Sequence, residues 1–464
     1  MTGAASGLLL LKSKTAFGYQ ANSAVRLGLL GCGGRGTAVA TSFARNTTAH
    51  VIALADIFPN QAATARTHFD ELNASLGKPP IDPQLIFHGP DAFQELAHTH
   101  GIDMVQISTP PWFHVEHLAA AVAGGKHVYC EKPMGVDIAQ TRQAMEIARR
   151  VARDGKLSVD VGFQVRSAPP IAAIMERIKA GAIGQIASIT AYYNAPASKE
   201  HVPPGITPGE HRLRNWLWDR ALSGDILVEQ NIHIIDLCNL ALGAHPLKAM
   251  ATGGRTIVHH AGNCWDNYQV NYTYPGVRGI KEQGIKEQAA DGQRAEDHRA
   301  NGQRGSARGS EVHVSFSSTQ FGESSFDAGL SLFGSEGRAD APYTGAIKIT
   351  GSQPWAWTEP AVRGASSSGS AAPRSGFAAN GDFEDNLALA DREKDRSFIE
   401  SITSGRFHNQ IATGVETAQS CMLGRMAGLL GRMAGLTGRT VTWEDLLAHG
   451  ETYPLGMNLN QFKT

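Results

Sequence analysis

The chain has 464 residues, of which 42% are hydrophobic, and its 42 lysines and arginines nearly balance its 43 aspartates and glutamates, for a net charge of −1. This length is about three times the ~150 residues of a typical domain and predicts two domains with insertions, or three small ones. The balanced charge excludes a protein that binds nucleic acid mainly through phosphates, because no excess of cations can replace counterions. The hydrophobic content excludes a wholly disordered chain, and no run reaches the ~18 apolar residues that span a bilayer, so no membrane partner is expected.

The first 24 residues are predicted to be a leader or a truncated export signal. Four leucines, Leu8–Leu11, follow a stretch of small residues and precede Lys12, Lys14 and a polar region. This order matches the apolar centre and cleavage end of an export signal, without the charged beginning or a twin arginine. It points to an exported, periplasmic protein, and the alternative is a cytoplasmic protein with a loose tail or a misplaced start codon.

Residues 25–158 are predicted to form a doubly wound parallel α/β domain of the Rossmann type. Short apolar runs at Val25–Leu30, Val51–Ala55, Met104–Ser108 and Lys126–Cys130 alternate with segments of helical periodicity. Short buried strands that alternate with helices are typical of this fold, because each helix covers one face of the parallel sheet.

Residues 159–464 are predicted to form an α+β domain with an open, largely antiparallel sheet. Runs such as Ile186–Tyr193, Tyr268–Tyr274 and Val312–Phe316 alternate apolar and polar residues with period two. This alternation is typical of strands with one buried face.

Helices and inserted segments complete the second domain. One helix is predicted over Asp225–Leu242, and two closing helices within residues 385–436. Residues 278–310 contain few large apolar residues and predict a disordered insertion in a hairpin loop, and residues 363–376 predict a flexible crossing.

A glycine-rich turn after the first strand predicts a dinucleotide site. Gly31, Gly33 and Gly36 form the pattern Gly-x-Gly-x-x-Gly between a strand and a helix, with Gly34 and Arg35 inside it. Glycines let a pyrophosphate approach the backbone, and the first N–H groups of the helix bind it. The alternative is a glycine-rich turn that binds no ligand.

Asp56 ends the second strand, 20 residues after Gly36. At that place a carboxylate accepts hydrogen bonds from the ribose hydroxyls of the cofactor. The same charge favours NAD over NADP, because it repels a 2′-phosphate. NADP stays possible, since Arg35 is close in sequence to the turn and could offset the charge.

Lys132 lies in the segment Glu131-Lys132-Pro133 after the fourth strand. The proline favours an extended conformation at Lys132, so the side chain projects from the end of the sheet, where ligands of open α/β sheets bind. A lysine there can hydrogen-bond a substrate hydroxyl and share in moving its proton. The alternative is a solvated turn residue.

His233 is the candidate general base. Glu229 precedes it by four residues and Asp236 follows it by three, so helical geometry predicts both carboxylates beside the imidazole. A neighbouring carboxylate orients the ring and raises its basicity. The alternatives are a helix face with a packing role, or a metal site, which no dense histidine cluster supports.

Three other residues are weaker candidates. His114 follows the third strand and is predicted to open a helix near the cofactor, with a capping or packing role as the alternative. Trp216 and Trp218 could wall a nicotinamide or sugar face, or belong to the core. No metal site and no disulfide scaffold are predicted, because the five cysteines are far apart and form no C-x-x-C pair.

Taken in order, these motifs resemble those of the Gfo/Idh/MocA oxidoreductases, the family of glucose–fructose oxidoreductase and inositol dehydrogenase. The resemblance runs over residues 25–243 and resumes over residues 396–447. Its most specific part is Gly125–Pro133, which reads Gly-Lys-His-Val-x-x-Glu-Lys-Pro and is followed by His233 and Asp236.

The resemblance implies an NAD(P)-binding Rossmann domain and an α/β domain whose open sheet faces the active site and often mediates oligomers, here a homodimer or homotetramer. Family substrates are mostly sugars, inositols and their derivatives. Lys132 corresponds to the active-site lysine and His233 to the catalytic histidine, whereas Glu229 stands where inositol dehydrogenases carry an aspartate. The residues expected at the cofactor are Gly31, Gly33, Gly34, Arg35, Gly36, Asp56, Thr109, Pro110, His114, Glu131, Lys132 and Gln164. Those expected at the substrate are Lys132, Arg166, Trp216 and His233.

The sequence therefore predicts an NAD(P)-dependent dehydrogenase of a sugar, polyol or glycoside, with Lys132, His233 and Glu229 as its catalytic residues. The first alternative is a redox glycosidase that retains NAD and cleaves a glycosidic bond by transient oxidation, elimination and hydration. The second is a protein that binds a sugar or nucleotide in the same pocket without catalysis.

Overall fold

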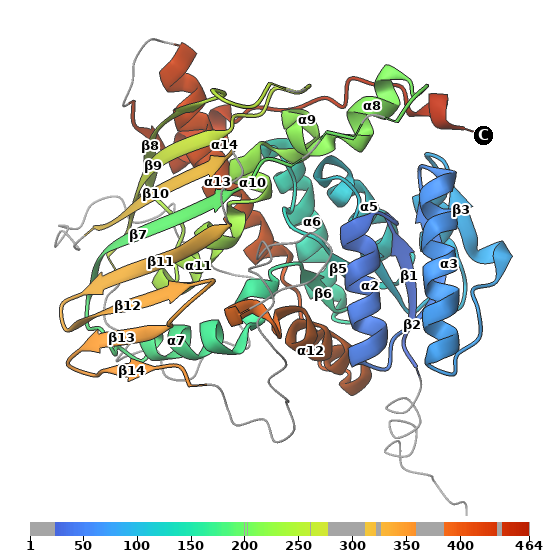
Figure 1. Cartoon of the computed structure of the whole chain (residues 1–464), viewed down its shortest axis with the longest axis horizontal. Helices are drawn as coiled ribbons and strands as arrows, with labels where there is room; N and C mark the ends of the chain where they lie inside the picture. The colour runs from blue at the N-terminus through green and yellow to red at the C-terminus, as the bar shows by residue number, and fades with distance from the viewer. Residues whose placement is uncertain are drawn as a thin grey trace, which may run out of the picture.

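The computed structural model describes residues 24–198, 200–201, 203–259, 261–276, 311–321, 326–358, 385–433 and 439–463. These residues form two sheets with helices packed on them (Figure 1). The predictions for the leader, except its last residue, for the insertion at 278–310 and for the crossing at 363–376 lie outside the described residues.

The first sheet has six parallel strands in the order β3-β2-β1-β4-β5-β6. The strands are β1 (Arg26–Leu30), β2 (His50–Asp56), β3 (Ile86–His88), β4 (Met104–Ile107), β5 (His127–Cys130) and β6 (Val159–Val161). Apart from the edge strand β3, most of their residues are buried, because helices cover both faces of the sheet. The predicted Rossmann fold is confirmed.

The helices of this half are α2 (Gly34–Asn46), α3 (Pro59–Ser75), α4 (Ala92–His98), α5 (His114–Ala123) and α6 (Ile138–Asp154), with the short 3₁₀ helices η1 (Pro83–Leu85) and η2 (Pro111–Phe113). One face of the sheet is covered by α2 and α3, and the other by α4, α5 and α6. A later segment, α12 (Ala390–Ser404), joins the face of α2, where Phe398 contacts Phe43 edge to face at 6.1 Å between ring centroids. The C-terminal part of the chain thus completes the core of the first sheet.

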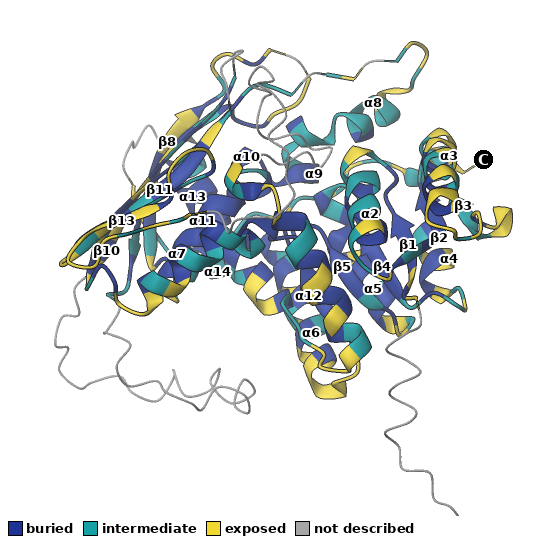
Figure 2. Ribbon diagram, turned by 60° about the horizontal axis from the view of Figure 1, so that its bottom comes forward, coloured by how far each residue is buried: buried dark blue, intermediate teal, exposed yellow. Residues whose placement is uncertain are grey.

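The second sheet has nine strands in the order β14-β13-β12-β11-β7-β10-β9-β8-β15. The strands are β7 (Ile186–Ala195), β8 (Lys248–Gly254), β9 (Asn267–Tyr274), β10 (Val312–Gln320), β11 (Asp327–Gly334), β12 (Gly337–Pro342), β13 (Lys348–Gly351), β14 (Trp355–Ala356) and β15 (Val441–Thr442). Among the described strands of this sheet only β7 and β10 pair in parallel, so the predicted largely antiparallel sheet is confirmed. Buried and exposed residues alternate along its strands, and Figure 2 shows exposed positions along the sheet.

The remaining helices cover the buried face of this sheet or link it to the first half. They are η3 (Gln164–Ser167), α7 (Pro169–Lys179), α8 (Pro208–Arg214), η4 (Trp216–Trp218), α9 (Arg220–Ser223), α10 (Ile226–Glu229), α11 (Ile232–Leu242), η6 (Asp385–Leu387), α13 (Ile411–Met433), α14 (Trp443–His449) and η7 (Leu459–Phe462). The single helix predicted over Asp225–Leu242 is instead two, because the chain breaks between α10 and α11. None of the described helices is both long and apolar enough to cross a membrane.

Candidate active site

The glycine turn leaves the start of α2 open. Gly31 has φ +92°, and a Cβ there would lie 2.6 Å from the backbone of Ser108, while a Cβ at Gly36 would lie 1.9 Å from the carbonyl oxygen of Gly31. By contrast, a Cβ at Gly33 or Gly34 would meet no atom within 4 Å. Two glycines are therefore required by close packing, and the other two leave a cradle at the helix N-terminus that fits a diphosphate.

Asp56 lies beside this turn at the end of β2. Its carboxylate accepts hydrogen bonds from the backbone N–H of Cys32 at 2.7 Å and of Phe58 at 2.9 Å. Burial raises the pKa of Asp56, and these two hydrogen bonds oppose that effect. The backbone thus holds the carboxylate at the edge of a cavity, where its remaining lone pairs can accept from a ribose.

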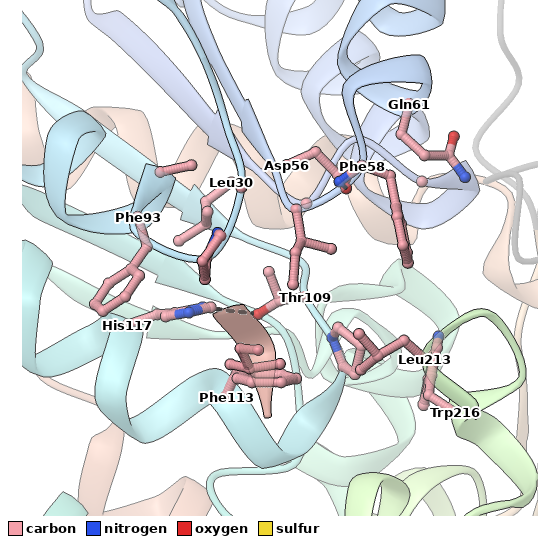
Figure 3. A pocket seen from close by; sticks show the side chains of 18 of the residues that line it. Leu30, Asp56, Phe58, Gln61, Phe93, Thr109, Phe113, His117, Leu213 and Trp216 are labelled. Atoms are coloured by element: carbon pink, nitrogen blue, oxygen red, sulfur yellow. Dashed lines mark hydrogen bonds between the residues drawn. The ribbon is translucent and has the colours of Figure 1, made fainter. Parts of the chain in front are cut away.

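A first cavity, of about 460 Å³, extends from the glycine turn and Asp56. Figure 3 shows the rings of Phe93, His117 and Phe113 gathered on one side of it. The imidazole of His117 hydrogen-bonds the hydroxyl of Thr109 at 3.0 Å and stacks on Phe113 with ring centroids 5.6 Å apart. Apolar walls with a few polar groups are typical of small-molecule sites and suit an adenosine.

The C-terminal residues 451–463, called the C-terminal strap below, close one side of the first cavity. Leu459 and Asn460 line the cavity, and Phe462 packs edge to face on Phe58 at 5.6 Å between centroids. Hydrogen bonds fix the strap along its length, from Trp112 Nε1 to the carbonyl of Tyr453 and from Arg212 to that of Leu455. No site residue predicted from the sequence lies in the strap, although its alternating apolar residues were a signal that it packs.

A second cavity, of about 320 Å³, adjoins the first. The two share Ser108, Thr109 and Trp216 as lining residues, so they lie side by side. The second cavity is lined by residues of both halves of the chain, among them Lys132 after β5 and His233 in α11. This is the arrangement required of a site in which a cofactor and a substrate meet.

Lys132 reaches across to the second half of the chain. Its Nζ donates to the carboxylate of Glu229 at 2.5 Å and to the backbone carbonyl of the same residue at 2.6 Å. The peptide bond between Lys132 and Pro133 is cis. The side chain is 12% exposed, so the ammonium is held at the cavity by a buried ion pair.

His233 lies in the first turn of α11 and is buried at the wall of the same cavity. Burial lowers the pKa of His233 well below its usual value, and the positive charges of Lys132 and Arg35 lower it further. The imidazole is therefore neutral near pH 7 and can accept a proton. Its ring faces Phe163 edge on, with centroids 6.4 Å apart.

The two carboxylates predicted to flank His233 each bind a cationic side chain. Glu229 ends α10, before the break in the helix, and its carboxylate binds Lys132. Asp236 accepts two hydrogen bonds from Arg166, one of them 2.5 Å long, and a third from Thr417 at 3.1 Å. Arg166, expected at the substrate, thus ties η3 to α11 and is absent from the lining of both cavities.

Arg35 and Glu131 form a second, partly buried ion pair beside the site. Arg35 Nε donates to Glu131 at 2.9 Å, and its two other nitrogens donate to Asp391 of α12 at 2.9 and 3.1 Å. Lys394 also binds Asp391 at 3.1 Å. The guanidinium is thereby held by the carboxylates of Glu131 and Asp391.

The other expected residues have distinct places. Pro110 lines the first cavity and Gln164 the second, and both cavities are lined by Thr109 and Trp216. His114 contacts the backbone carbonyls of Pro133 at 2.9 Å and of Thr109 at 2.8 Å, and burial lowers its pKa. It therefore positions the loop that carries Lys132. Among the described residues no cluster of three or more His, Cys, Asp or Glu side chains is arranged to bind a metal ion.

Two family models match the chain. The model of an oxidoreductase family with an NAD-binding Rossmann fold matches residues 25–161, and that of the GFO/IDH/MocA C-terminal domain matches residues 171–339. Together they cover well over half of the chain.

Individual relatives share 27–30% of their residues with this chain over the matched regions. The chain is 28% identical over 242 residues to inositol 2-dehydrogenase of Rhizobium meliloti, which covers 52% of this chain and 62% of the relative. It is 27% identical over 191 residues to levoglucosan dehydrogenase of Pseudarthrobacter phenanthrenivorans, a match that covers 41% of this chain and 42% of the relative. It is 30% identical over 123 residues to a glycosyl hydrolase family 109 protein of Solibacter usitatus, a match that covers 26% of this chain and 27% of the relative. The chain thus spans less than two thirds of the length of these relatives.

Solved structures share the fold. Levoglucosan dehydrogenase in complex with NADH and levoglucosan superposes with a TM-score of 0.62 at 17% identity, covering 90% of this chain and 99% of that one. A putative myo-inositol dehydrogenase of Sinorhizobium meliloti gives a TM-score of 0.56 at 19% identity, covering 90% of this chain and 99% of that one.

Proposed function

The chain belongs to the oxidoreductase family with an NAD-binding Rossmann fold, and we propose that it transfers a hydride between NAD and a hydroxyl-bearing carbon of a sugar, polyol or glycoside. One observation carries the proposal: Lys132 and a neutral, buried His233 line one cavity, which adjoins a second cavity built on the glycine turn. The relatives named for inositol and levoglucosan support the substrate class.

The residues of the first cavity fit the cofactor. The open cradle at Gly33 and Gly34 suits the diphosphate, and Asp56 suits the ribose. NAD is favoured over NADP, because the Asp56 carboxylate would repel a 2′-phosphate while Arg35 is paired elsewhere. Bound NAD supplies the acceptor for the hydride that leaves the substrate carbon.

In the second cavity each residue has a distinct role. The neutral imidazole of His233 takes the proton of the reacting hydroxyl. The Lys132 ammonium donates a hydrogen bond to the hydroxyl oxygen and stabilises negative charge as it develops there. Glu229 holds the ammonium in place, and Trp216 walls the junction of the two cavities.

The test is an assay of NADH formation with purified protein, NAD and a panel of sugars, inositols and glycosides. We expect an increase in absorbance with at least one of them, and a loss of about 100-fold or more in kcat for Lys132→Ala. No turnover of any substrate, with NAD still bound, would contradict the proposal and favour a non-catalytic binding protein.

A redox glycosidase is the second candidate. It is supported by the match to glycosyl hydrolase family 109 proteins and by the C-terminal strap, which covers a cavity suited to retaining NAD. Cleavage of a glycoside without net formation of NADH, together with NAD that stays bound through purification, would identify it.

We also propose that the protein is a homo-oligomer. The outer face of the second sheet carries exposed large apolar side chains, Met250 at 40% and Phe333 at 37% exposure. Association of two such faces would bury them. Light scattering in solution measures the mass, and a monomer at micromolar concentration would contradict this proposal.

A further inference from the structure

Gln320 occupies a position in the second sheet where the pattern calls for an apolar side chain. The buried positions of β10 alternate along the strand, and Gln320 is the last of them. It is 1% exposed and lines the second cavity. Neither its amide oxygen nor its amide nitrogen has a hydrogen-bond partner among the described residues. Because buried polar groups are almost always hydrogen-bonded, this amide points to a ligand.

Two other glutamines repeat the observation from different elements. Gln164, in η3, and Gln230, between α10 and α11, line the same cavity. The side-chain oxygen of each is buried and lacks a partner within the described part of the chain. Three amide oxygens thus need donors, and the amide nitrogen of Gln320 needs an acceptor.

These unsatisfied acceptors and the unsatisfied donor indicate the kind of ligand that the cavity binds. Hydroxyl groups both donate and accept, so a ligand with several of them can satisfy three acceptors and one donor. A carboxylate, a phosphate dianion or a ketone only accepts, and would leave the glutamine oxygens without partners. Leaving a buried acceptor unsatisfied costs binding energy, which favours a ligand rich in hydroxyls.

The charges of the cavity lead to the same class. The charged residues of its lining are joined in two ion pairs, Lys132 with Glu229 and Arg35 with Glu131. The histidines of the lining, His114 and His233, have pKa values lowered by burial and are neutral near pH 7. An anionic ligand would lose its hydration without gaining a counter-ion of its own.

Building on the proposed function, we propose that the second cavity recognises an uncharged, polyhydroxylated ring, and that Gln320 and Gln230 bind hydroxyl groups away from the carbon that reacts. Sugar phosphates and sugar acids are excluded. Gln320, at the end of β10, is then a specificity-determining residue supplied by the second sheet, whereas the Rossmann domain supplies Lys132.

The first experiment measures binding to the full-length protein loaded with NADH. The neutral probes are glucose, myo-inositol and levoglucosan, and the charged matches are glucuronate and glucose 6-phosphate, each followed by calorimetry or saturation-transfer NMR. We expect at least one neutral probe to bind, and at least tenfold more tightly than either charged probe. Binding of no neutral probe, or equal binding of a charged one, overturns the proposal.

The second experiment uses Gln320→Met, which keeps the length of the side chain and removes its polar atoms. We expect the neutral probe to bind about ten- to a hundredfold more weakly. We also expect the melting temperature of the ligand-free variant to be no lower than that of the parent, because an amide without a partner is removed. Gln269→Met, on the exposed face of the neighbouring strand, is the matched control and should change neither.

The outcomes separate this inference from the proposed function. Sugar binding that depends on Gln320, without NADH formation from any substrate, contradicts the dehydrogenase and keeps the inference. Turnover with unchanged KM in Gln320→Met keeps the dehydrogenase and overturns the inference. A variant that melts well below the parent shows that the amide has a structural role, which also overturns it.

Discussion

The ion pair between Lys132 and Glu229 gives the sharpest test of how the site is assembled. Both side chains are about nine-tenths buried, and the ammonium keeps only a backbone carbonyl, at 2.6 Å, when the carboxylate is removed. Truncating one partner of a buried ion pair costs about 3–5 kcal/mol, and the retained carbonyl places Glu229→Leu at the lower end, about 3 kcal/mol. We expect kcat to fall as well, by about 100-fold, because the ammonium is no longer held toward the substrate hydroxyl.

The measurement is chemical denaturation of four proteins: the parent, Glu229→Leu, Lys132→Met and the double variant. The double variant buries no unpaired charge, so it should recover about 2 kcal/mol relative to the sum of the single variants. Glu146→Leu is the matched control, since its ion pair with Arg149 is largely exposed and should contribute less than about 1 kcal/mol. Additivity of the two buried substitutions within about 0.5 kcal/mol would refute the reasoning.

Three further predictions concern the first cavity. Gly33→Ala should fold normally but weaken NADH binding at least tenfold in a fluorescence titration, because its Cβ meets no protein atom yet enters the diphosphate cradle. Gly36→Ala should instead lower the melting temperature, because its Cβ meets the Gly31 carbonyl. Equal effects of the two variants on binding and on melting temperature would contradict the cradle. Phe462→Ala should speed NADH dissociation in stopped-flow fluorescence by about tenfold, since it frees the C-terminal strap; an unchanged rate would remove the strap from the site. Burial lowers the pKa of His117 to about 3, below its unfolded value of 6.5, so the free energy of unfolding decreases by about 2 kcal/mol as the pH falls from 7 to 5. In urea unfolding, His117→Gln should lose about 2 kcal/mol less than the parent over this pH range. The same pH dependence in both proteins would refute the assignment.

Local patterns in the sequence were sufficient for the first half of the fold. The glycine turn, the strand ends and the lysine before Pro133 depend on backbone conformation within a few residues, which spacing can predict. The same holds for the period-two strands of the second sheet. The roles of Lys132 and His233 stay predictions, although both side chains line one cavity.

The partners of charged residues could not be predicted in this way. The expectation that Glu229 flanks His233 assumed one continuous helix, and the break after α10 sends the carboxylate to Lys132, 97 residues away. Arg166 was expected at the substrate, but Asp236 holds it. Gln320 was not singled out, because the sequence does not show that the buried face of β10 ends at a cavity instead of the core.

The adjacent residues Glu131 and Lys132 explain how one short segment connects the glycine turn with the second half of the chain. Glu131 accepts from Arg35, which follows the glycine cradle, and Lys132 donates to Glu229 in the second half of the chain. Because desolvating two ion pairs is costly, their value lies in fixing geometry more than in stabilising the fold. A shift of either pair would move the ammonium relative to both cavities at once. The Glu-Lys-Pro segment therefore fixes the position of Lys132 between the two cavities, with a charged partner on each side.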